Sequence, residues 1–542
     1  MSAHLSIAEI LKHHVSLSAE SYDRIYLNGY LSGLQTSGGL VRFLAEQRNS
    51  PVPSPVVLRR MSQAYSKEVE QFAEEQTIPL IQFERGQRKD DLANTLRAKD
   101  PRRDCVVFIG TAQEKQTGFK GRCERCNGFT LFHYSRQSVC VKHYYYYIDD
   151  EDFGPMFIKV GSYFPYPVKV CLNGHEWAKR QLEKENIDYK SLDNGFLSCA
   201  DPVRLQEICA SLGPDQIEAM FHKWICRIPW YMNAKDRAAG YIHKLSVWQM
   251  EFSRTDVFDR PLRGREFFEA VIRENLDLGR PDRVQLLFNR RRGIRKDTPG
   301  RFRTRVITDG VAPNLHIEYK KTGIKQYFKE NRALRTETTI NDPLDFKIKK
   351  GLKNLPALAA IARQTNLRVL ETERVSQDCV MSPHSVQRLT QPSIQEDGQR
   401  VPGLKLTDPR VGALLAALCL FLHLPAGFRN RQLRPYVADL LGMDRDNYSA
   451  AKMSYDLRRL RMKGIVCRVP GSTRWTLTPY GLRVSLFVSR LHARVLRTGF
   501  ASANPDEITP VTHPLRTALD QVQTEVNTIL EQARLMPREK AA

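Results

Sequence analysis

The sequence predicts a multidomain α/β protein (mixed α+β), with a central mixed-sheet core that carries an inserted hairpin and is followed by a compact helical domain. The chain has 542 residues, which suggests about two to four domains. Hydrophobic residues make up 42% of it and charged residues 26%, as in an ordinary folded protein. Strand-like apolar runs alternate with helical segments through the middle of the chain, which is typical of α/β organisation.

Two breaks in composition divide the chain. The proline-rich stretch PVPSPVV follows shortly after Arg48, and a polar, turn-rich stretch begins at Ser376. We therefore expect an N-terminal helical segment over 1–50, an α/β core over 51–375 with an inserted hairpin at 121–143, a linker over 376–402, a compact domain over 403–500, and a tail with a C-terminal helix over 501–542.

The elements of the core follow from its apolar runs. A helix over 55–75 precedes a strand, a helix and a strand, written IPLIQFERG, RKDDLANTLRAK and CVVFIG. Three strands come next, KHYYYYIDD, FGPMFIKVGSYF and YPVKVCLNG, and then the helix HEWAKRQLEKEN. Residues 202–278 look mostly helical. Four strands then precede a helix over 352–372: VQLLFN, FRTRVITD, LHIEYK and ALRTETTIN. In a strand, the four consecutive tyrosines at 144–147 would point alternately to the two faces.

The compact domain is strongly basic. Residues 401–500 hold 17 Lys/Arg against 5 Asp/Glu, and so carry +12 of the chain's net charge of +23. The sequence pI is about 9.6. This excess of base indicates partners that bear phosphate groups.

The same domain has a regular pattern of helices. An apolar first helix, DPRVGALLAALCLFLHLP, precedes a second, RQLRPYVADLLG, and a third, AAKMSYDLRRLRMKG, to which Met453, Leu457 and Leu460 give a buried stripe. Asn430 and Ser449 can cap the second and third helices. The segments IVCRVP and TRWTLT then predict a two-stranded hairpin before a last helix.

This order of elements resembles the winged helix-turn-helix DNA-binding domains of bacterial proteins. The resemblance covers about a fifth of the chain. It implies a third helix that enters the major groove and a wing that contacts the backbone. The residues expected to contact nucleic acid here are Lys452, Arg458, Arg459, Arg461 and Arg474. A winged helix that binds protein or RNA is the alternative.

Two basic stretches of the core predict further contacts with nucleic acid. FNRRRGIRKDTPGRFRTR, at 288–305, has eight Lys/Arg and one acid, and guanidinium groups suit phosphate oxygens. KKTGIKQYFK, at 320–329, combines lysines with aromatic residues, which suits backbone binding with base stacking. The residues selected are Arg290, Arg291, Arg292, Arg295, Lys320 and Lys321. Solvated loops are the alternative.

The inserted hairpin carries a zinc pattern. Cys123-x2-Cys126 and Cys140-x2-His143 form two pairs of ligands separated by thirteen residues. This spacing suits a closed, tetrahedral, structural Zn²⁺ site, and the segment between the pairs could form the two short strands of a zinc ribbon. Three unrelated cysteines and a strand histidine are the alternative. The spare candidates for the fourth ligand are His133 and Cys105.

Carboxylates near strand ends predict a second metal site. Asp150 and Asp152 follow the apolar run HYYYYI, Glu176 opens the next helix, and Glu337 lies within a later strand. We take these four acids as candidate catalytic ligands of Mg²⁺ or Mn²⁺, ions that support phosphodiester chemistry. A simple hairpin turn at 149–152 and surface pairing of Glu337 with Arg335 are the alternatives.

A second catalytic hypothesis uses a tyrosine. His316-x-Glu318, followed by Tyr327, is loosely similar to rolling-circle replication initiators, in which a histidine-rich strand holds a metal and a tyrosine attacks a phosphate. This sequence departs from that pattern, because one histidine and one acid stand where the family has a pair of histidines.

Other features restrict the class of protein. Eleven scattered cysteines fit a reducing cytosol. The sequence has no 18-residue apolar run and no signal-peptide pattern at its start, so no membrane association is expected. It has no Walker A loop, Rossmann fingerprint, HExxH or GxSxG. The segments 143–180 and RALRTETTIND are similar to parts of bacterial proteins, which implies a prokaryotic cytoplasmic protein but supplies no activity.

The sequence therefore predicts a cytoplasmic, nucleoid-associated nucleic-acid-binding protein, with DNA as the expected partner and RNA as the alternative. The expected activity is divalent-metal-dependent phosphodiester chemistry of the nuclease, replication or mobile-element type. The rival functions are a non-catalytic winged-helix DNA-binding regulator and an RNA-binding ribonucleoprotein component. The C-terminal helix could join copies of the chain into a homo-oligomer.

Overall fold

The computed structural model describes residues 6–275 and 303–491, together with 287–288, 521, 524–525 and 528, except for short gaps at 51, 53, 85, 88, 100–101, 127–128, 310–311, 320, 331, 378–380, 395–397, 420–426 and 445–446. The chain divides into two compact units. The larger unit comprises Met1–Phe268 and Arg283–Val369, and the smaller comprises Glu269–Asp282 and Leu370–Ala542.

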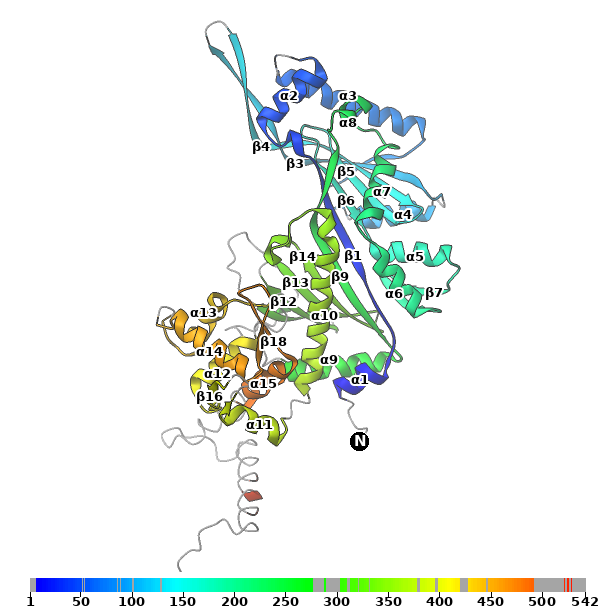
Figure 1. The fold of residues 1–542 in the computed structure, drawn as a ribbon. Coiled ribbons are helices and arrows are strands. Elements are labelled where there is room, and N and C mark those ends of the chain that lie inside the picture. The colour runs from blue at the N-terminus through cyan, green and yellow to red at the C-terminus, as the bar shows by residue number, and fades with distance from the viewer. Residues whose placement is uncertain are drawn as a thin grey trace, which may run out of the picture. The chain divides into compact units, whose positions relative to one another are not determined.

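Within the described residues, twelve strands of the larger unit form one mixed sheet (Figure 1). Their order is β10-β11-β12-β13-β14-β9-β1-β6-β5-β4-β3-β2. The edge pairs β10–β11 and β2–β3 are parallel, and the pairs between them are antiparallel. The predicted α/β class with a large central mixed sheet is therefore confirmed. The strands are β1 Val15–Leu31, β2 Leu80–Gln82, β3 Cys105–Cys126, β4 Phe129–Asp150, β5 Gly154–Gly161, β6 Val168–Leu172, β9 His243–Phe258, β10 Leu287–Phe288, β11 Arg303–Asp309, β12 Ala312–Tyr319, β13 Thr322–Lys329 and β14 Ala333–Ile340.

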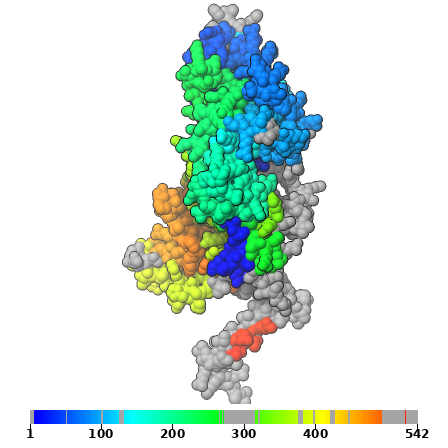
Figure 2. All heavy atoms as spheres, turned by 90° about the vertical axis from the view of Figure 1, so that its right-hand side faces the viewer, coloured from blue at the N-terminus to red at the C-terminus, as the bar shows by residue number. Residues whose placement is uncertain are grey.

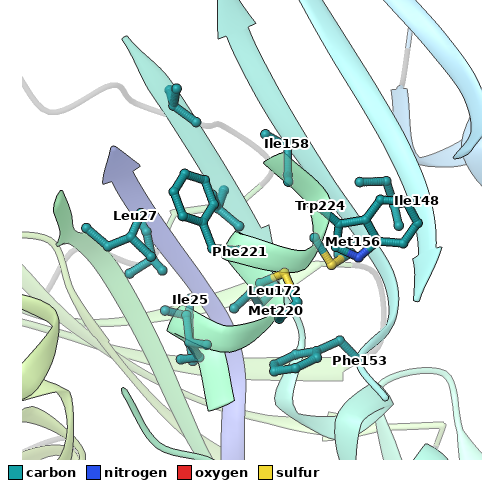
Figure 3. Packing of buried hydrophobic residues seen from close by; sticks show 14 of the residues in the cluster. Ile25, Leu27, Ile148, Phe153, Met156, Ile158, Leu172, Met220, Phe221 and Trp224 are labelled. Atoms are coloured by element: carbon teal, nitrogen blue, oxygen red, sulfur yellow. The ribbon is translucent and has the colours of Figure 1, made fainter. Parts of the chain in front are cut away.

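Side-chain alternation along the strands separates an apolar face from a more polar one. On β1, Ile25 and Leu27 are fully buried and belong to one hydrophobic cluster with Phe221 of helix α7 (Pro214–Ile225), as Figure 3 shows. Tyr26 points to the opposite side of the sheet, because successive strand residues alternate. We call the side of Ile25 the apolar face and the side of Tyr26 the open face.

The apolar face continues across the other half of the sheet. Val369 of helix α10 (Leu355–Gln377) packs against Ile317 of β12 and Ile324 of β13. Asn366 of the same helix donates a hydrogen bond to the carbonyl oxygen of Phe252 at 3.1 Å. Helices α7 and α10 thus bury this side of the sheet.

The four tyrosines of β4 alternate as the sequence predicts. Tyr146 lies on the apolar face, where its hydroxyl is 3.0 Å from that of Tyr65 on helix α3 (Pro55–Glu75). Tyr147 lies on the open face, in a small hydrophobic cluster with side chains of helix α4 (Lys89–Lys99). The two tyrosine pairs therefore build two separate packing layers.

The expected N-terminal helical segment is wrong over much of its length. Strand β1 occupies residues 15–31, between the helices α1 (Ile7–His13) and α2 (Ser37–Arg48). Its apolar residues recur at every second position, as at Leu17 and Ala19, which is the strand period and not the helical one. The mostly helical prediction for 202–278 likewise fails at β9, the direct neighbour of β1.

Within the smaller unit, the described residues of 409–490 form three helices, a two-stranded hairpin and a further helix, in that chain order. Asp456 is buried and accepts a hydrogen bond from Arg410 at 2.7 Å and another from the Tyr448 hydroxyl, so it fastens the third helix to the start of the first. Gly427 has a φ of +67°, and a Cβ there would lie 2.2 Å from the carbonyl oxygen of Trp475, so glycine is required beside the hairpin. These elements are α12 Pro409–Cys419, α13 Asn430–Leu440, α14 Ala450–Met462, β17 Val466–Arg468, β18 Trp475–Leu477 and α15 Pro479–Arg490.

The remaining helices and strands are shorter connections or lie at the margins of the units. They are α5 Gly174–Lys184, β7 Tyr189–Leu192, β8 Gly195–Cys199, α6 Pro202–Ser211, α8 Ala234–Ala238, α9 Pro261–Asn275, α11 Pro383–Thr390, β15 Ser393–Ile394 and β16 Arg400–Val401. In the described part of the chain, no helix combines the length and apolar character needed to cross a membrane.

Candidate acid–base site

Buried polar side chains gather on the central strands β1, β9, β13 and β14, beside the first turn of α5. Five of them are at most 7% exposed, in a sheet whose neighbouring positions are largely apolar. The residues of α5 and α6, in teal, lie on the face that Figure 2 turns toward the viewer. We call this group the acid–base site. It consists of Asp23, His175, Ser253, Arg335 and Glu337, with Tyr327 at its margin.

A β-bulge presents Asp23. Strand β1 pairs with β9 at Tyr22↔Phe252 and Arg24↔Glu251, so Asp23 is the extra residue between two ladder positions. An extra residue leaves the regular alternation, and its side chain can be turned toward a neighbouring element. The bulge thus frees Asp23 to meet groups from other elements.

The close start of α5 brings His175 to β1. Strand β6 ends at Leu172, and the Asn173 side chain then caps α5 by accepting the backbone N–H of His175 at 2.9 Å. At Gly174, a Cβ would lie 2.6 Å from the carbonyl oxygen of Tyr22. Glycine therefore allows the helix to begin against the strand.

Asp23 is the central acceptor of the site. Its Oδ1 lies 2.5 Å from His175 Nε2, accepts from Ser253 Oγ at 2.8 Å, and forms an ion pair with Arg335. Burial alone would raise the pKa of Asp23, but the Arg335 guanidinium and the His175 hydrogen bond outweigh it and hold that pKa well below its usual range. Burial lowers the pKa of His175, so its ring is neutral at pH 7 and Nε2–H is the donor to Asp23.

Three polar atoms in this site have no hydrogen-bond partner among the described residues. They are Asp23 Oδ2, His175 Nδ1 and Arg335 Nε, and each is buried. Leaving a buried polar atom unpaired costs about 1–3 kcal/mol, so such atoms are rare in folded proteins and often accompany function.

Glu337 has the opposite electrostatic environment. Burial, together with the negative charges of Asp23 and Glu251, raises the pKa of Glu337 to about 7. The Tyr327 hydroxyl donates to Glu337 Oε2 at 3.3 Å, and burial raises the pKa of that phenol, so it stays protonated at neutral pH. Two neighbouring carboxyl groups with pKa values shifted in opposite directions are a pattern of acid–base catalysis: Glu337 can exchange a proton near pH 7 while Asp23 stays ionised.

The register places Glu337 in a polar row that crosses the open face. Lys325 of β13 and Ser253 of β9 pair with it directly, and His316 of β12 pairs with Lys325. Lys325 is exposed, so the row reaches solvent on this side. His316 and Tyr327, from the motif that suggested a tyrosine nucleophile, lie on the same face of the sheet as Glu337. However, Tyr327 is held in its protonated form, which disfavours attack by its oxygen.

The four carboxylates predicted to bind Mg²⁺ or Mn²⁺ do not converge. Asp150 ends β4 on the apolar face, where it accepts hydrogen bonds from Trp224 Nε1 at 2.7 Å and Lys223 Nζ at 2.9 Å. Five strand spacings separate β4 from the strand of Glu337, about 24 Å. Asp150 therefore supports the packing of α7 and cannot share an ion with Glu337.

The other two predicted acids have local partners. Asp152 pairs with Lys184 at the surface, and Glu176 pairs with Lys179 one helical turn along at 2.8 Å. Across the residues that the structure describes, no group of three or more His, Cys, Asp and Glu side chains could hold a metal ion. The four acids predicted to bind a divalent ion therefore do not form one site, and of them Glu337 alone belongs to the acid–base site.

The predicted zinc ligands do not come together either. Cys140 pairs with Lys115, which lies eight residues before Cys123 on β3, a separation of about 26 Å along the strand. His143 is buried, and burial lowers its pKa to about 4. The side chain of Cys126 lies outside the described residues. Strands β3 and β4 form one long hairpin in place of the expected ribbon, so these four residues do not fit a single zinc ion.

The basic stretches of the larger unit fall mostly outside the described residues. Lys321 is exposed and pairs with Asp342 at 2.8 Å, which makes it a surface ion pair. The residues outside the described part are Arg290, Arg291, Arg292, Arg295 and Lys320.

Sequence reasoning selected Glu337 and, as an alternative, its pairing with Arg335, whose Nε lies 3.8 Å from Glu337 Oε2 in a buried and not a surface pair. It missed Asp23, His175 and Ser253. The signal was an ionisable residue inside an apolar strand, which is costly unless it is paired. The same rule applies to Asp23 in SYDRIYL and to Arg335 in ALRTETTI. What the sequence did not reveal is that β1, β9 and β14 are neighbours.

Comparisons with known proteins add no relative: no family model, no curated protein and no solved structure matches the chain.

Replacing Glu337 with Gln should remove a pH dependence of stability. A carboxyl whose pKa is raised from 4.5 to about 7 stabilises the fold fully below about pH 4.5, and this contribution is lost as the pH rises through 7. Between pH 5 and pH 8, the wild-type protein should therefore lose about 1–3 kcal/mol of unfolding free energy that Glu337→Gln does not lose. Urea unfolding at several pH values measures this. Glu218→Gln, at an exposed acid, should behave as wild type; identical pH slopes in all three proteins would contradict the raised pKa.

Replacing Asp150 with Ala should reduce stability by about 2–4 kcal/mol, because it removes a buried acceptor from Lys223 and Trp224. Asp152→Ala at the exposed end of the same turn should cost less than about 0.5 kcal/mol. Urea unfolding compares the two. Equal effects would mean that Asp150 does not fasten α7.

Proposed function

We propose that this chain binds nucleic acid, with DNA as its main partner, through the smaller unit, and that it makes or breaks phosphodiester bonds at the acid–base site. The observation that carries the proposal is the exposed, cationic side of α14. Lys452, Tyr455, Arg458 and Arg461 are exposed along this helix, opposite a buried stripe. Exposed cations at helical spacing suit the groove and the phosphates of a duplex.

The elements around α14 support a winged-helix interpretation. Helix α13 precedes it, and the hairpin β17–β18 follows it directly, in the order of that family. Ser449 caps α14 by accepting the backbone N–H of Lys452 at 3.2 Å. We therefore propose α14 as the helix that enters the major groove and the hairpin as the wing.

The predicted contact residues differ in how free they are to meet DNA. Arg459 donates to the carbonyl oxygen of Gly403, and Arg474 to that of Gly427 at 2.5 Å, so both also hold the fold together. Arg458 donates to the exposed Gln399 side chain at 2.6 Å, a bond that a phosphate can replace. We expect Arg458 and its exposed neighbours to contribute more of the affinity.

The acid–base site supports the chemical half of the proposal. Hydrolysis of a phosphodiester requires a group that takes a proton from the attacking water and one that returns a proton to the leaving oxygen. With a pKa of about 7, Glu337 exists in both forms near neutral pH. Lys325, exposed in the same row, can contact the phosphate. The expected ligands of Mg²⁺ or Mn²⁺ lie apart, and dependence on either ion stays a prediction.

One observation favours a second function. The Asp23–Arg335 ion pair is almost completely buried, as a purely structural lock would be. It favours a winged-helix DNA-binding regulator without catalysis. An RNA-binding component, a homo-oligomer joined by the C-terminal helix and a cytoplasmic location also stay predictions.

Replacing both Lys452 and Arg458 with Ala should weaken binding of the full chain to duplex DNA about tenfold or more. Each lost phosphate contact also reduces the slope of log affinity against log salt by about one. Fluorescence anisotropy at several salt concentrations measures both quantities. Lys349→Ala with Lys353→Ala, an equal change of charge at exposed residues of the larger unit, is the control. Unchanged affinity in the first variant would reject α14 as the docking helix.

Glu337→Gln should reduce any cleavage of DNA by the full chain at least a hundredfold, because it removes the proton-transfer group, while the dissociation constant stays the same. The assay compares single-stranded DNA, duplex DNA and RNA, each with Mg²⁺, Mn²⁺ or a chelator. Tyr327→Phe should keep substantial activity. No cleavage by the wild-type protein under any of these conditions would leave the regulator as the better function.

A further inference from the structure

Strands β9 and β1 expose aromatic side chains on the open face. Trp248 is 41% exposed and Tyr30 is 37% exposed. A bulge interrupts the β9–β1 ladder between the partners of Tyr26 and Leu27, and Trp248 is the extra residue there. Its ring meets Tyr26 edge to face, with the ring centroids 5.9 Å apart. Large exposed rings that cluster on one face of a protein mark a binding surface.

Lysines surround these rings. Lys169 Nζ lies 3.9 Å from the ring centroid of Trp248. Lys159 of β5 pairs with Lys169 of β6, and Lys244 of β9 pairs with Tyr30 of β1. Burial and the neighbouring charge of Lys159 lower the pKa of Lys169. An anion beside these two lysines would reduce their mutual repulsion.

The acid that acts on both Lys159 and Lys169 is Glu114, and it already has partners. Glu114 accepts from Lys159, from the Tyr145 hydroxyl and from Lys89 Nζ, the last at 3.2 Å. Lys169 and Lys244 form no ion pair within the residues that the structure describes. The lysines beside Trp248 and Tyr30 are thus available to an anionic ligand.

A hollow adjoins Tyr26 on the same face. It has a volume of about 330 Å³ and lies between α4 and the sheet. Two cations, Arg24 and Arg97, and three acids, Asp90, Glu176 and Asp193, line it, and Phe157 supplies an aromatic wall. Glu176 pairs with Lys179, and Asp193 lies 3.8 Å from Lys329. Asp90 lies 3.9 Å from Arg24, a long and exposed ion pair that a ligand can displace. A hollow of this size accommodates one nucleotide.

Exposed rings among lysines suit single-stranded nucleic acid, since its bases stack on aromatic faces and its phosphates bind cations. A duplex keeps its bases stacked on one another and would leave these rings unused. We infer that the open face of β9, β1 and β6 binds a single-stranded segment of nucleic acid, with one nucleotide in the hollow beside Tyr26. The inference rests on the proposed function for the class of ligand, and adds a second site on the larger unit.

The position of this face relates it to the acid–base site. Ser253 follows Trp248 by five residues on β9, about 17 Å along the strand. Glu337 pairs with Ser253. A single strand that lies along β9 from Trp248 would therefore carry its phosphates toward Glu337.

Trp248→Ala tests the inference in the full chain. Its dissociation constant for a fluorescent oligothymidine should rise about tenfold, the expected loss when one stacked base is released. Trp248→Phe should restore most of the affinity, and Lys169→Ala should weaken binding and its salt dependence. Ile242→Ala, at another exposed apolar residue near the start of β9, is the control. An oligouridine of equal length, as the RNA arm, shows whether the sugar matters.

The duplex arm separates this inference from the proposed function. Trp248→Ala should bind duplex DNA as tightly as the wild-type protein, and Lys452→Ala with Arg458→Ala should bind oligothymidine as tightly. The inference would be overturned if Trp248→Ala bound oligothymidine as tightly as the wild-type protein does. It would also be overturned if polyglutamate displaced oligothymidine from the wild-type protein as well as unlabelled oligothymidine does. If the wild-type protein bound neither duplex DNA nor oligothymidine, the proposed function itself would be rejected.

Discussion

The buried ion pair between Asp23 and Arg335 is the interaction on which the rest of the larger unit depends. It joins β1 to β14 across β9, and both side chains are almost inaccessible to water. Removing one partner of such a pair would cost about 3–5 kcal/mol, since it leaves the other charge buried and alone. The pair also sets the chemistry. It keeps Asp23 ionised, and the negative charge of Asp23 helps to raise the pKa of Glu337 toward neutrality.

The sequence predicted the elements of this fold better than their arrangement. The tyrosine run, the strands around Glu337 and the helix limits near Ser449 all follow from local patterns of burial and capping. The N-terminal strand did not: the two-residue period is present at Leu17 and Ala19, but the bulge at Asp23 interrupts it before Ile25 and Leu27. Close spacing of cysteines along the chain misled as well: a long hairpin separates residues in space as it extends, so the pattern at Cys123 and Cys140 does not make a site.

The plane of the sheet separates the candidate site from the main hydrophobic core. Helices α7 and α10 bury the apolar face, and Asp150, which the sequence suggested for catalysis, accepts a hydrogen bond there from Trp224 of α7. The other side keeps Glu337, Lys325 and the exposed Trp248 within a few strands of each other. Both side-chain sets come from the same strands by simple alternation. Substitutions on the open face can therefore change what the sheet binds while the side chains of the apolar face keep the core unchanged.

The pairing of β1 with β9 has a consequence for how the protein is made. Val15 pairs with Phe258, so the central ladder joins residues more than two hundred positions apart. At about 5–20 residues per second, a ribosome needs on the order of ten to fifty seconds to deliver the second strand after the first. Throughout that time β1 has no partner for this edge, and an unpaired strand is open to aggregation. The two halves of the sheet can therefore join at β1 and β9 only after all the residues between these strands have been synthesised.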